Sequence, residues 1–134
     1  MAVRFLLDTH ILVRWHAEPR RLTREQARVL RDATRQGEQV AISAMTLLEI
    51  ALLFGEGRSR SNTPAGEFLR DVDGNPAIQI LPLSVDVAEE VAALGPALRD
   101  PADRAIVATA RVHRLKLLTS DERIIDSKLV AVVG

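Results

Sequence analysis

The chain has 134 residues, of which 47% are hydrophobic and 27% charged, so it can bury the core of one ordinary domain and is neither disordered nor repetitive. Eighteen basic and eighteen acidic side chains cancel, which excludes general attraction of nucleic acid by net charge. The absence of cysteine excludes a disulfide scaffold, a zinc finger and a thiol nucleophile. No apolar run approaches the roughly 18 to 20 residues of a membrane span, so we expect a cytoplasmic protein without membrane attachment.

Short apolar runs alternate with helical patterns along the whole chain, and capping residues mark where the helices begin and end. Thr23 opens a helix that Gly37 closes, and Ser43, Ser84 and Asp100 precede three further helices. In chain order we expect strand 3–7, a helix around 11–15, helix 23–37, strand 40–42, helix 44–54, loop 55–66, helix 65–73, strand 78–81, helix 84–94, helix 101–114, strand 115–119, a helical turn after 121 and strand 129–133.

This order of elements predicts the fold class. Several of the strands are apolar without alternation, which is typical of strands buried on both faces of a parallel sheet. Regular alternation of strands and helices favours an α/β fold with helices on both sides of a mainly parallel sheet of about five strands. We expect residues 1–134 to form a single domain.

Four acidic residues stand where such a fold could bring them together. Ligands of parallel α/β sheets bind beyond the carboxyl ends of the strands, and Asp8 and Asp121 each follow a predicted strand directly. Glu49 is a lone charge in an apolar helix and needs a partner or a cavity. Asp103 lies in the first turn of the helix that Asp100 opens. These positions predict a shared acidic site.

Converging carboxylates suit phosphodiester cleavage assisted by Mg²⁺ or Mn²⁺. Hard cations prefer oxygen ligands, and Mg²⁺ takes few protein carboxylates while keeping places for water and a substrate phosphate. A metal-bound water is a nucleophile at neutral pH, and the ion offsets the charge that develops on the phosphate. The reaction needs neither cysteine nor histidine.

The acids of the last two predicted helices also have structural interpretations. Asp100 is a natural N-cap before Pro101, which places Asp103 in the first turn, where a carboxylate is favoured by the helix dipole. Asp121 could likewise be the N-cap of the turn that follows it. Each of these acids, taken alone, is better explained by its place at the start of a helix than by catalysis.

The two acids nearer the amino terminus are harder to explain by capping. Glu49 could form a capping box with Thr46 or pair with an arginine of a neighbouring element. Asp8 has the weakest structural interpretation, because a carboxylate after a strand caps little unless Thr9 already begins a helix. The occurrence of all four acids together favours a functional site.

Four segments of the chain resemble the acidic motifs of the PIN-domain family, and the resemblance covers essentially the whole chain. These segments are Leu6–Leu12, Ile42–Ala51, Asp100–Ala110 and Leu118–Ile124. Their order, spacing and overall length are similar to those of the VapC-type toxins of bacterial toxin–antitoxin pairs. The resemblance implies a three-layer α/β/α nuclease, an Mg²⁺- or Mn²⁺-dependent endoribonuclease that forms homodimers and is held inactive by a cognate protein antitoxin.

The resemblance also implies roles for individual residues. By position, Asp8, Glu49, Asp103 and Asp121 are the catalytic acids, and Asp8, Asp103 and Asp121 are metal ligands. Asp100 duplicates the acid of the third motif and remains an alternative to Asp103. We choose Asp103 because it directly precedes the apolar helix and because Asp100 serves better as a cap.

Other residues carry weaker signals. The three histidines lack the paired spacing of a zinc site, and His10, two residues from Asp8, is expected to support the site rather than to bind metal. Trp15 suits either a partner surface or the core. One helix face carries a stripe of arginines that suits phosphate or antitoxin binding, or else a solvated face paired with neighbouring acids. These arginines are Arg24, Arg28, Arg31 and Arg35.

A non-enzymatic Mg²⁺-binding signalling module, such as a receiver-like domain, is the main alternative, and an inert partner-binding domain is another. A receiver-like domain needs a phosphoacceptor aspartate after a central strand and a well-placed lysine. Here Lys116 begins its predicted strand instead of ending it, and residues 81–83 close the third strand without an acid. The sequence therefore favours the nuclease.

Overall fold

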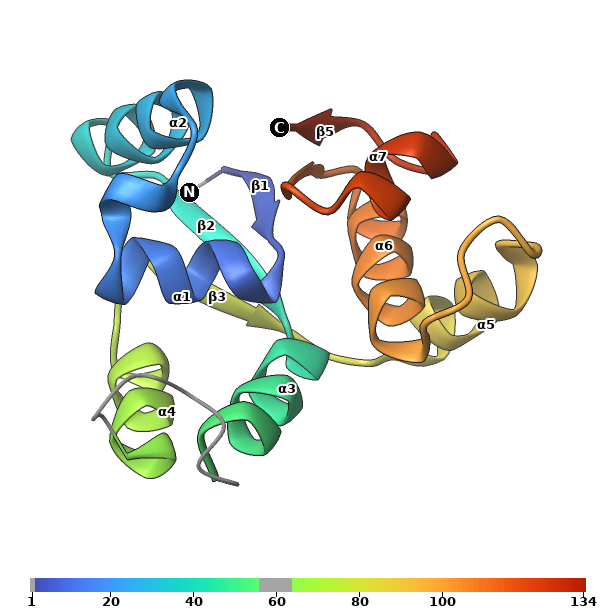
Figure 1. The fold of residues 1–134 in the computed structure, drawn as a ribbon, viewed down its shortest axis with the longest axis horizontal. Helices are drawn as coiled ribbons and strands as arrows, with labels where there is room; N and C mark the ends of the chain where they lie inside the picture. The colour runs from blue at the N-terminus through green and yellow to red at the C-terminus, as the bar shows by residue number, and fades with distance from the viewer. Residues whose placement is uncertain (1, 56–63) are drawn as a thin grey trace.

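The computed structural model describes residues 2–55 and 64–134 and contains a five-stranded sheet flanked by helices (Figure 1). Its elements are β1 (Val3–Leu7), α1 (Thr9–Ala17), the 3-10 turn η1 (Pro19–Arg21), α2 (Arg24–Arg35), β2 (Gln39–Ser43), α3 (Ala44–Gly55), α4 (Ala65–Asp73), β3 (Ile78–Leu81), α5 (Val85–Ala93), α6 (Pro101–His113), β4 (Lys116–Leu118), α7 (Glu122–Ser127) and β5 (Val132–Val133). Among the described residues, no helix has the length and apolar character needed to cross a membrane.

The strands lie in the order β3-β2-β1-β4-β5, and every neighbouring pair is parallel. The chain moves outward from β1 through β2 to β3, then crosses back by way of α5 and α6 to place β4 on the other side of β1. The direction of winding therefore reverses between β1 and β4, which is where parallel α/β sheets open a binding crevice.

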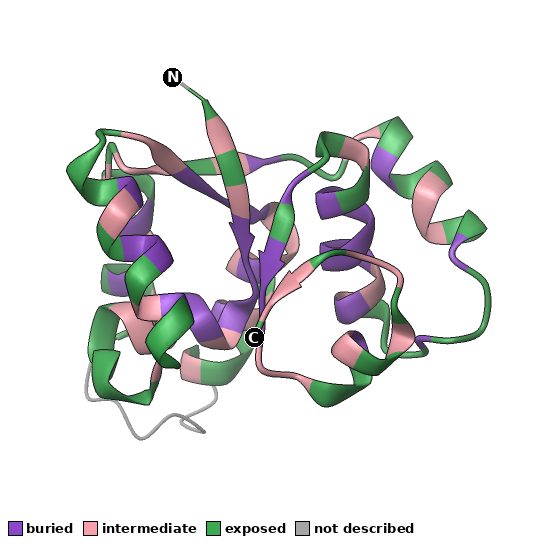
Figure 2. Cartoon of the chain, turned by 90° about the horizontal axis from the view of Figure 1, so that it is seen from above, coloured by how far each residue is buried: buried purple, intermediate pink, exposed green. Residues whose placement is uncertain are grey.

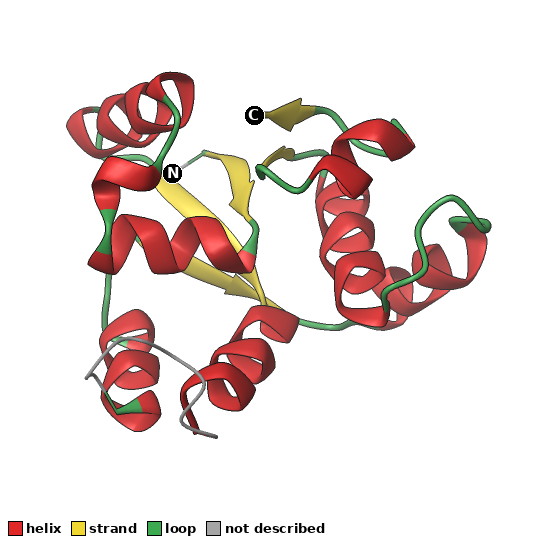
Figure 3. Ribbon diagram, viewed as in Figure 1, coloured by secondary structure: helices red, strands yellow, loops and turns green. Residues whose placement is uncertain are grey.

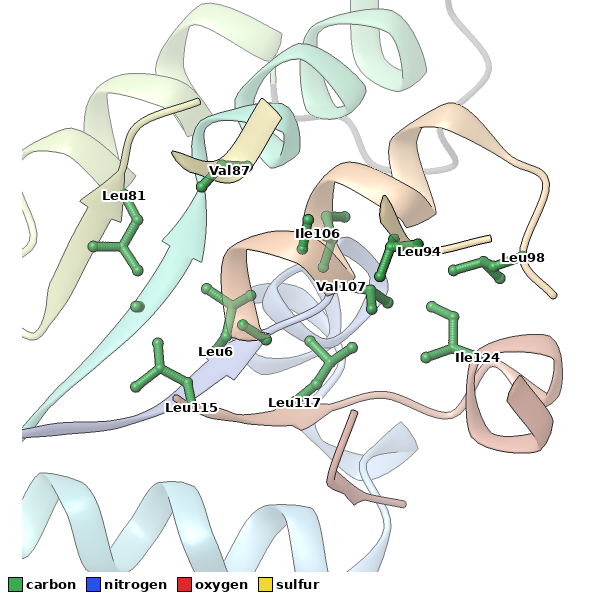
Figure 4. Packing of buried hydrophobic residues seen from close by; sticks show 13 residues of the cluster. Leu6, Leu81, Val87, Leu94, Leu98, Ile106, Val107, Leu115, Leu117 and Ile124 are labelled. Carbon is green, nitrogen blue, oxygen red and sulfur yellow. The ribbon is translucent and has the colours of Figure 1, made fainter. Parts of the chain in front are cut away.

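Helices cover both faces of the sheet, which confirms the expected α/β/α arrangement. Consecutive residues of a strand point to opposite faces, so Leu6 packs in a cluster with side chains of α5, α6 and α7 (Figure 4), whereas Leu7 packs with side chains of α1, α2, α3 and α4. Figure 2 shows the buried residues concentrated along the strands and on the helix faces that meet them. The two apolar clusters fix the sheet between its helical layers.

The element boundaries follow the sequence prediction with local exceptions. The last two strands are shorter than expected, and the first helix begins earlier, at Thr9, directly after Asp8. Gly37 closes the second helix as expected, with a positive φ of 67° that favours glycine. Of the predicted loop 55–66, residues 56–63 lie outside the described part, while Gly55 ends α3 and Pro64 precedes α4.

The arginine stripe of α2 is mainly a solvated face. Arg28 forms ion pairs with both Glu25 and Asp32, its neighbours one turn away, as the structural interpretation expected. Trp15 is half-buried and lines a cavity on each side, one toward α4 and one toward α2.

Gln26 joins the second helix to the carboxyl ends of two strands. It is fully buried and forms a capping box with Thr23. Its Nε2 also lies 3.3 Å from the carbonyl oxygen of Thr119, 3.1 Å from Oγ of Ser120 and 3.3 Å from the carbonyl oxygen of Val133. The amide therefore holds in place the segment that follows β4.

We expect Gln26→Leu to lower the free energy of unfolding by about 2 to 4 kcal/mol, because it removes the side-chain half of the capping box and leaves buried acceptors without a donor. Urea denaturation followed by circular dichroism measures the change. Gln36→Leu, at an exposed position after the same helix, is the control and should cost less than about 1 kcal/mol. Equal effects of the two substitutions would contradict the role given to Gln26.

Candidate active site

A cavity of about 280 Å³ opens at the carboxyl ends of β1 and β4, where the winding of the sheet reverses. In Figure 3 the helices α1 and α3 begin almost directly after their strands, so Asp8, at the first of these two junctions, is held on a short segment. The residues that line the cavity are Asp8, Thr9, His10, Glu49, Leu53, Asp100, Asp103, Asp121 and Arg123. The structure thus brings together all four predicted acids, together with Asp100.

Asp8 is buried and is the N-cap of α1. Its Oδ1 accepts a hydrogen bond from the backbone N–H of Thr9 at 2.9 Å, and its Oδ2 accepts one from the hydroxyl of Thr119 at 2.7 Å. The structural interpretation of Asp8 was therefore underestimated, because Thr9 does begin a helix. Both carboxylate oxygens are held in a fixed orientation at the edge of the cavity.

Glu49 is held by a threonine of another helix. Its Oε1 accepts a hydrogen bond of 2.5 Å from the hydroxyl of Thr9, which also lies 3.0 Å from the hydroxyl of Thr46. The capping box of Thr46 with Glu49, one of two structural alternatives for this acid, does not form, because Thr46 lies inside α3, which begins at Ala44. Burial raises the pKa of Glu49, and the charges of Asp8 and Asp100 raise it further.

Asp103 has the least compensated carboxylate of the site. Burial, followed by the charges of Asp100, Asp8 and Asp121, raises the pKa of Asp103 to about 7. Its Oδ2 is buried and has no hydrogen-bond donor within the described residues. Asp100 is exposed and caps α6 by accepting from the backbone N–H of Asp103 at 2.9 Å, as its cap interpretation expected.

Asp121 is the N-cap of α7 and is paired with Arg123. Its Oδ1 accepts from the backbone N–H of Arg123 at 2.9 Å, and its Oδ2 lies 3.0 Å from Nη2 of the guanidinium. This pairing lowers the pKa of Asp121. The same Nη2 lies 3.6 Å from Oδ2 of Asp103, so the guanidinium contacts both acids.

His10 connects the beginning of α1 to the segment after β4. Its Nε2 accepts a hydrogen bond from the backbone N–H of Ser120 at 3.0 Å, and its Nδ1 lies 3.5 Å from Oδ2 of Asp8. Because a backbone N–H only donates, Nε2 carries no proton in this arrangement, and burial lowers the pKa of His10 accordingly. His10 thus supports the position of Asp8, as the sequence suggested.

Sequence reasoning missed Thr119 and Arg123. Thr119 donates to Asp8 and accepts from the backbone N–H of Asp121 at 3.0 Å, so one hydroxyl links two of the acids. Both residues stand two positions from Asp121, a spacing that is common around N-caps but reveals neither the contact of Thr119 with Asp8 nor that of Arg123 with Asp103.

The donor set suits a hard divalent cation, although the side chains do not yet surround one position. All the candidate ligands are carboxylate oxygens, and Oδ2 of Asp103 is an acceptor without a donor. Within residues 2–55 and 64–134, no three acidic or histidine side chains form a ready-made metal site. Carboxylates repel one another until a cation lies between them, so convergence to ligand distances would follow cation binding.

Comparison with known proteins gives consistent results. The chain matches the PIN domain over residues 5–128. It is 31% identical over 120 residues to Ribonuclease VapC22 of Mycobacterium tuberculosis, an alignment that covers 89% of this chain and 88% of that protein.

Solved structures of toxin–antitoxin complexes share the fold. A toxin–antitoxin complex from Klebsiella pneumoniae is 26% identical, with a TM-score of 0.66 over 96% of this chain and 95% of the other. VapBC2 from Rickettsia felis, bound to a DNA fragment from its promoter, has a TM-score of 0.71 at 16% identity and covers 98% of both chains. The sequence match and the fold together lead to one conclusion: this chain belongs to the PIN-domain family, with the VapC-type ribonuclease toxins as its relatives.

Proposed function

We propose that residues 1–134 form one cytoplasmic nuclease domain that hydrolyses RNA phosphodiester bonds with the help of Mg²⁺ or Mn²⁺. Asp8, Asp103 and Asp121 are the proposed metal ligands, and Glu49 is the fourth catalytic acid. The observation that carries the proposal is the gathering of these four carboxylates around one cavity, with a buried oxygen of Asp103 that has no donor among the described residues. The ribonuclease relative supports RNA as the substrate.

A bound divalent cation would supply an activated water and would offset negative charge on the phosphate. The residues of this chain would do the rest. Thr119 holds Asp8 so that its carboxylate stays at the cavity, and Thr9 does the same for Glu49. Burial raises the pKa of Glu49, which favours proton uptake by this carboxylate.

The signalling alternative gains no support from the described contacts. Lys116 pairs with Phe5 in the sheet, at the end of β4 opposite to the cavity. A lysine there is too far from the carboxyl ends of the strands to assist phosphorylation of Asp8.

The chain is proposed to act as a toxin whose cognate protein antitoxin blocks the site, and to form a homodimer. The solved structures with this fold include toxin–antitoxin complexes from several organisms, which supports a protein partner. Leu48 and Leu52 of α3 expose 53% and 51% of their surface, so α3 presents apolar side chains that a second copy could bury.

The first test is cleavage of defined RNAs by Asp8→Asn, Glu49→Gln, Asp103→Asn and Asp121→Asn. Each substitution should reduce the rate at least about 100-fold, because each removes a ligand or a proton acceptor. EDTA should abolish cleavage by the wild type, and Mg²⁺ or Mn²⁺ should restore it. Asp100→Asn is the matched control: loss of activity there, with full activity in Asp103→Asn, would show that Asp100 is the metal ligand.

The second test concerns stability without metal. Folding raises the pKa of Asp103 from 3.8 to about 7. As the pH rises between these two values, the folded state keeps a proton that the unfolded state releases, so the free energy of unfolding of the protein falls. In EDTA at pH 8, Asp103→Asn should therefore be more stable than wild type by about 1 to 3 kcal/mol, and the difference should vanish near pH 4. Denaturant melts at both pH values measure this.

Two comparisons make the stability test specific. Asp8→Asn should instead be destabilising in EDTA by about 1 kcal/mol, since it weakens a cap and a bond from Thr119. Millimolar Mn²⁺ should stabilise the wild type by mass action and Asp103→Asn much less. A wild type indifferent to Mn²⁺ would contradict the metal site.

The toxin proposal predicts a growth phenotype. Abundant expression of the wild type in a bacterial host should arrest growth, Asp103→Asn should not, and co-expression of the cognate antitoxin should restore growth. Colony counts after induction measure the effect. Harmless expression of a folded wild-type protein that also lacks nuclease activity would refute the toxin proposal.

A further inference from the structure

The side chain of Arg123 is highly exposed to solvent, and it also pairs with the carboxylate of Asp121. Its side chain is 72% exposed, yet its Nε and Nη2 both approach the Asp121 carboxylate, at 3.3 Å from Oδ1 and 3.0 Å from Oδ2. The backbone N–H of the same residue also donates to Asp121. The guanidinium is thus oriented at the rim of the cavity while most of its surface faces solvent.

This guanidinium is the strongest positive charge at the site. Five carboxylates line the cavity, and Arg123 is the one arginine or lysine that lines it in the described part of the chain. An RNA phosphate that approaches five carboxylates is repelled unless positive charge accompanies them. The divalent cation supplies part of that charge, and Arg123 is placed to supply more.

The cation and the guanidinium compete for the same oxygen atoms. Nη2 of Arg123 lies 3.6 Å from Oδ2 of Asp103, the atom proposed above as a metal ligand, and 3.0 Å from Oδ2 of Asp121. A cation bound there would both occupy these oxygens and repel the guanidinium. Leaving is inexpensive, because an ion pair formed by a solvent-exposed arginine contributes little to stability.

A displaced guanidinium would still be tethered beside the cavity. Arg123 lies in the first turn of α7, two residues after the N-cap Asp121, so its backbone stays fixed when its side chain moves. The planar guanidinium forms paired hydrogen bonds with phosphate oxygens, a geometry that the ammonium of lysine does not reproduce.

We propose that Arg123 is a mobile counter-ion of the site: it neutralises Asp103 and Asp121 in the metal-free protein, leaves Asp103 when the divalent cation binds, and then binds an RNA phosphate beside the cleavage position. The inference rests on the proposed function, because it takes Asp103 and Asp121 as metal ligands. A purely structural Arg123, which only pairs with its N-cap, would affect stability but neither metal nor RNA affinity.

The variants are Arg123→Gln, which removes the charge, and Arg123→Lys, which keeps the charge without the planar fork. Arg14→Gln is the matched control, because it removes one positive charge from α1 close enough to influence His10 without lining the cavity. Thermal melts of all four proteins first establish that each is folded.

The first measurement is Mn²⁺ affinity, followed by the electron paramagnetic resonance signal of the free ion without RNA. Arg123→Gln should bind Mn²⁺ about 3- to 10-fold more tightly than wild type, because the competing cation is gone. The Mn²⁺ affinity of Arg123→Lys should lie between those of the wild type and Arg123→Gln. Arg14→Gln should change the Mn²⁺ affinity less than about 2-fold.

The second measurement is the affinity for a short single-stranded RNA, by fluorescence anisotropy in Ca²⁺, with a gel to confirm that the RNA stays intact. Arg123→Gln should bind RNA more weakly than wild type. Its slope of log affinity against log salt should be smaller by about 0.7, the value for one lost phosphate contact on a single strand. Arg123→Lys should keep the wild-type slope but bind more weakly, and Arg14→Gln should match wild type.

The outcomes separate the two proposals. A wild type that binds no Mn²⁺ overturns the proposed metal site and with it this inference. A wild type that binds Mn²⁺, together with an Arg123→Gln variant unchanged in Mn²⁺ affinity or in the salt slope, overturns only the role of Arg123. If Arg14→Gln and Arg123→Gln changed the Mn²⁺ affinity and the salt slope equally, the effect would come from net charge alone, and the role of Arg123 would also be overturned.

Discussion

Carboxylates that share a poorly hydrated cavity repel one another, and the surroundings of this cavity place a compensating group beside most of them. Asp8 and Asp121 cap the amino ends of α1 and α7, and Asp103 lies in the first turn of α6, where the helix dipole favours negative charge. Glu49, inside its helix, depends on the hydroxyl of Thr9 instead. Helix capping and chemistry are therefore not competing explanations of these acids, because one carboxylate can do both.

The negative charge of Asp103 is incompletely compensated, and burying this carboxylate lowers the stability of the metal-free fold. Its buried Oδ2 has no described donor, and the pKa of this carboxyl is raised to about 7. The remainder of the fold tolerates the cost, since apolar clusters pack both faces of the sheet and Gln26 secures the segment that carries Asp121. A buried carboxylate oxygen without a hydrogen-bond donor is suited to binding a cation and therefore to metal-dependent chemistry.

Local signals predicted most elements and caps well. Thr23, Ser84 and Asp100 are N-caps as expected, because a cap and the backbone N–H that donates to it lie within three residues of each other. The role of Asp8 as a cap was underestimated, since the apolar spacing of α1 becomes visible only from Ile11 onward, after the helix has begun. The capping box of Thr46 with Glu49 does not form, because α3 begins at Ala44 as predicted and Thr46 already lies inside the helix.

The sequence by itself determined that acids follow the strands and open the helices of a parallel α/β fold, because strand burial, helix periodicity and capping are interactions between near neighbours. Only the tertiary structure decided which acid is left uncompensated and which partners the others have. The hydroxyl of Thr119 reaches Asp8 across 111 positions because β4 lies beside β1, and Arg123 of α7 reaches Asp103 of α6. The burial of an acid and its interactions with charges distant in the sequence depend on which segments pack together, and no local sequence pattern encodes that packing.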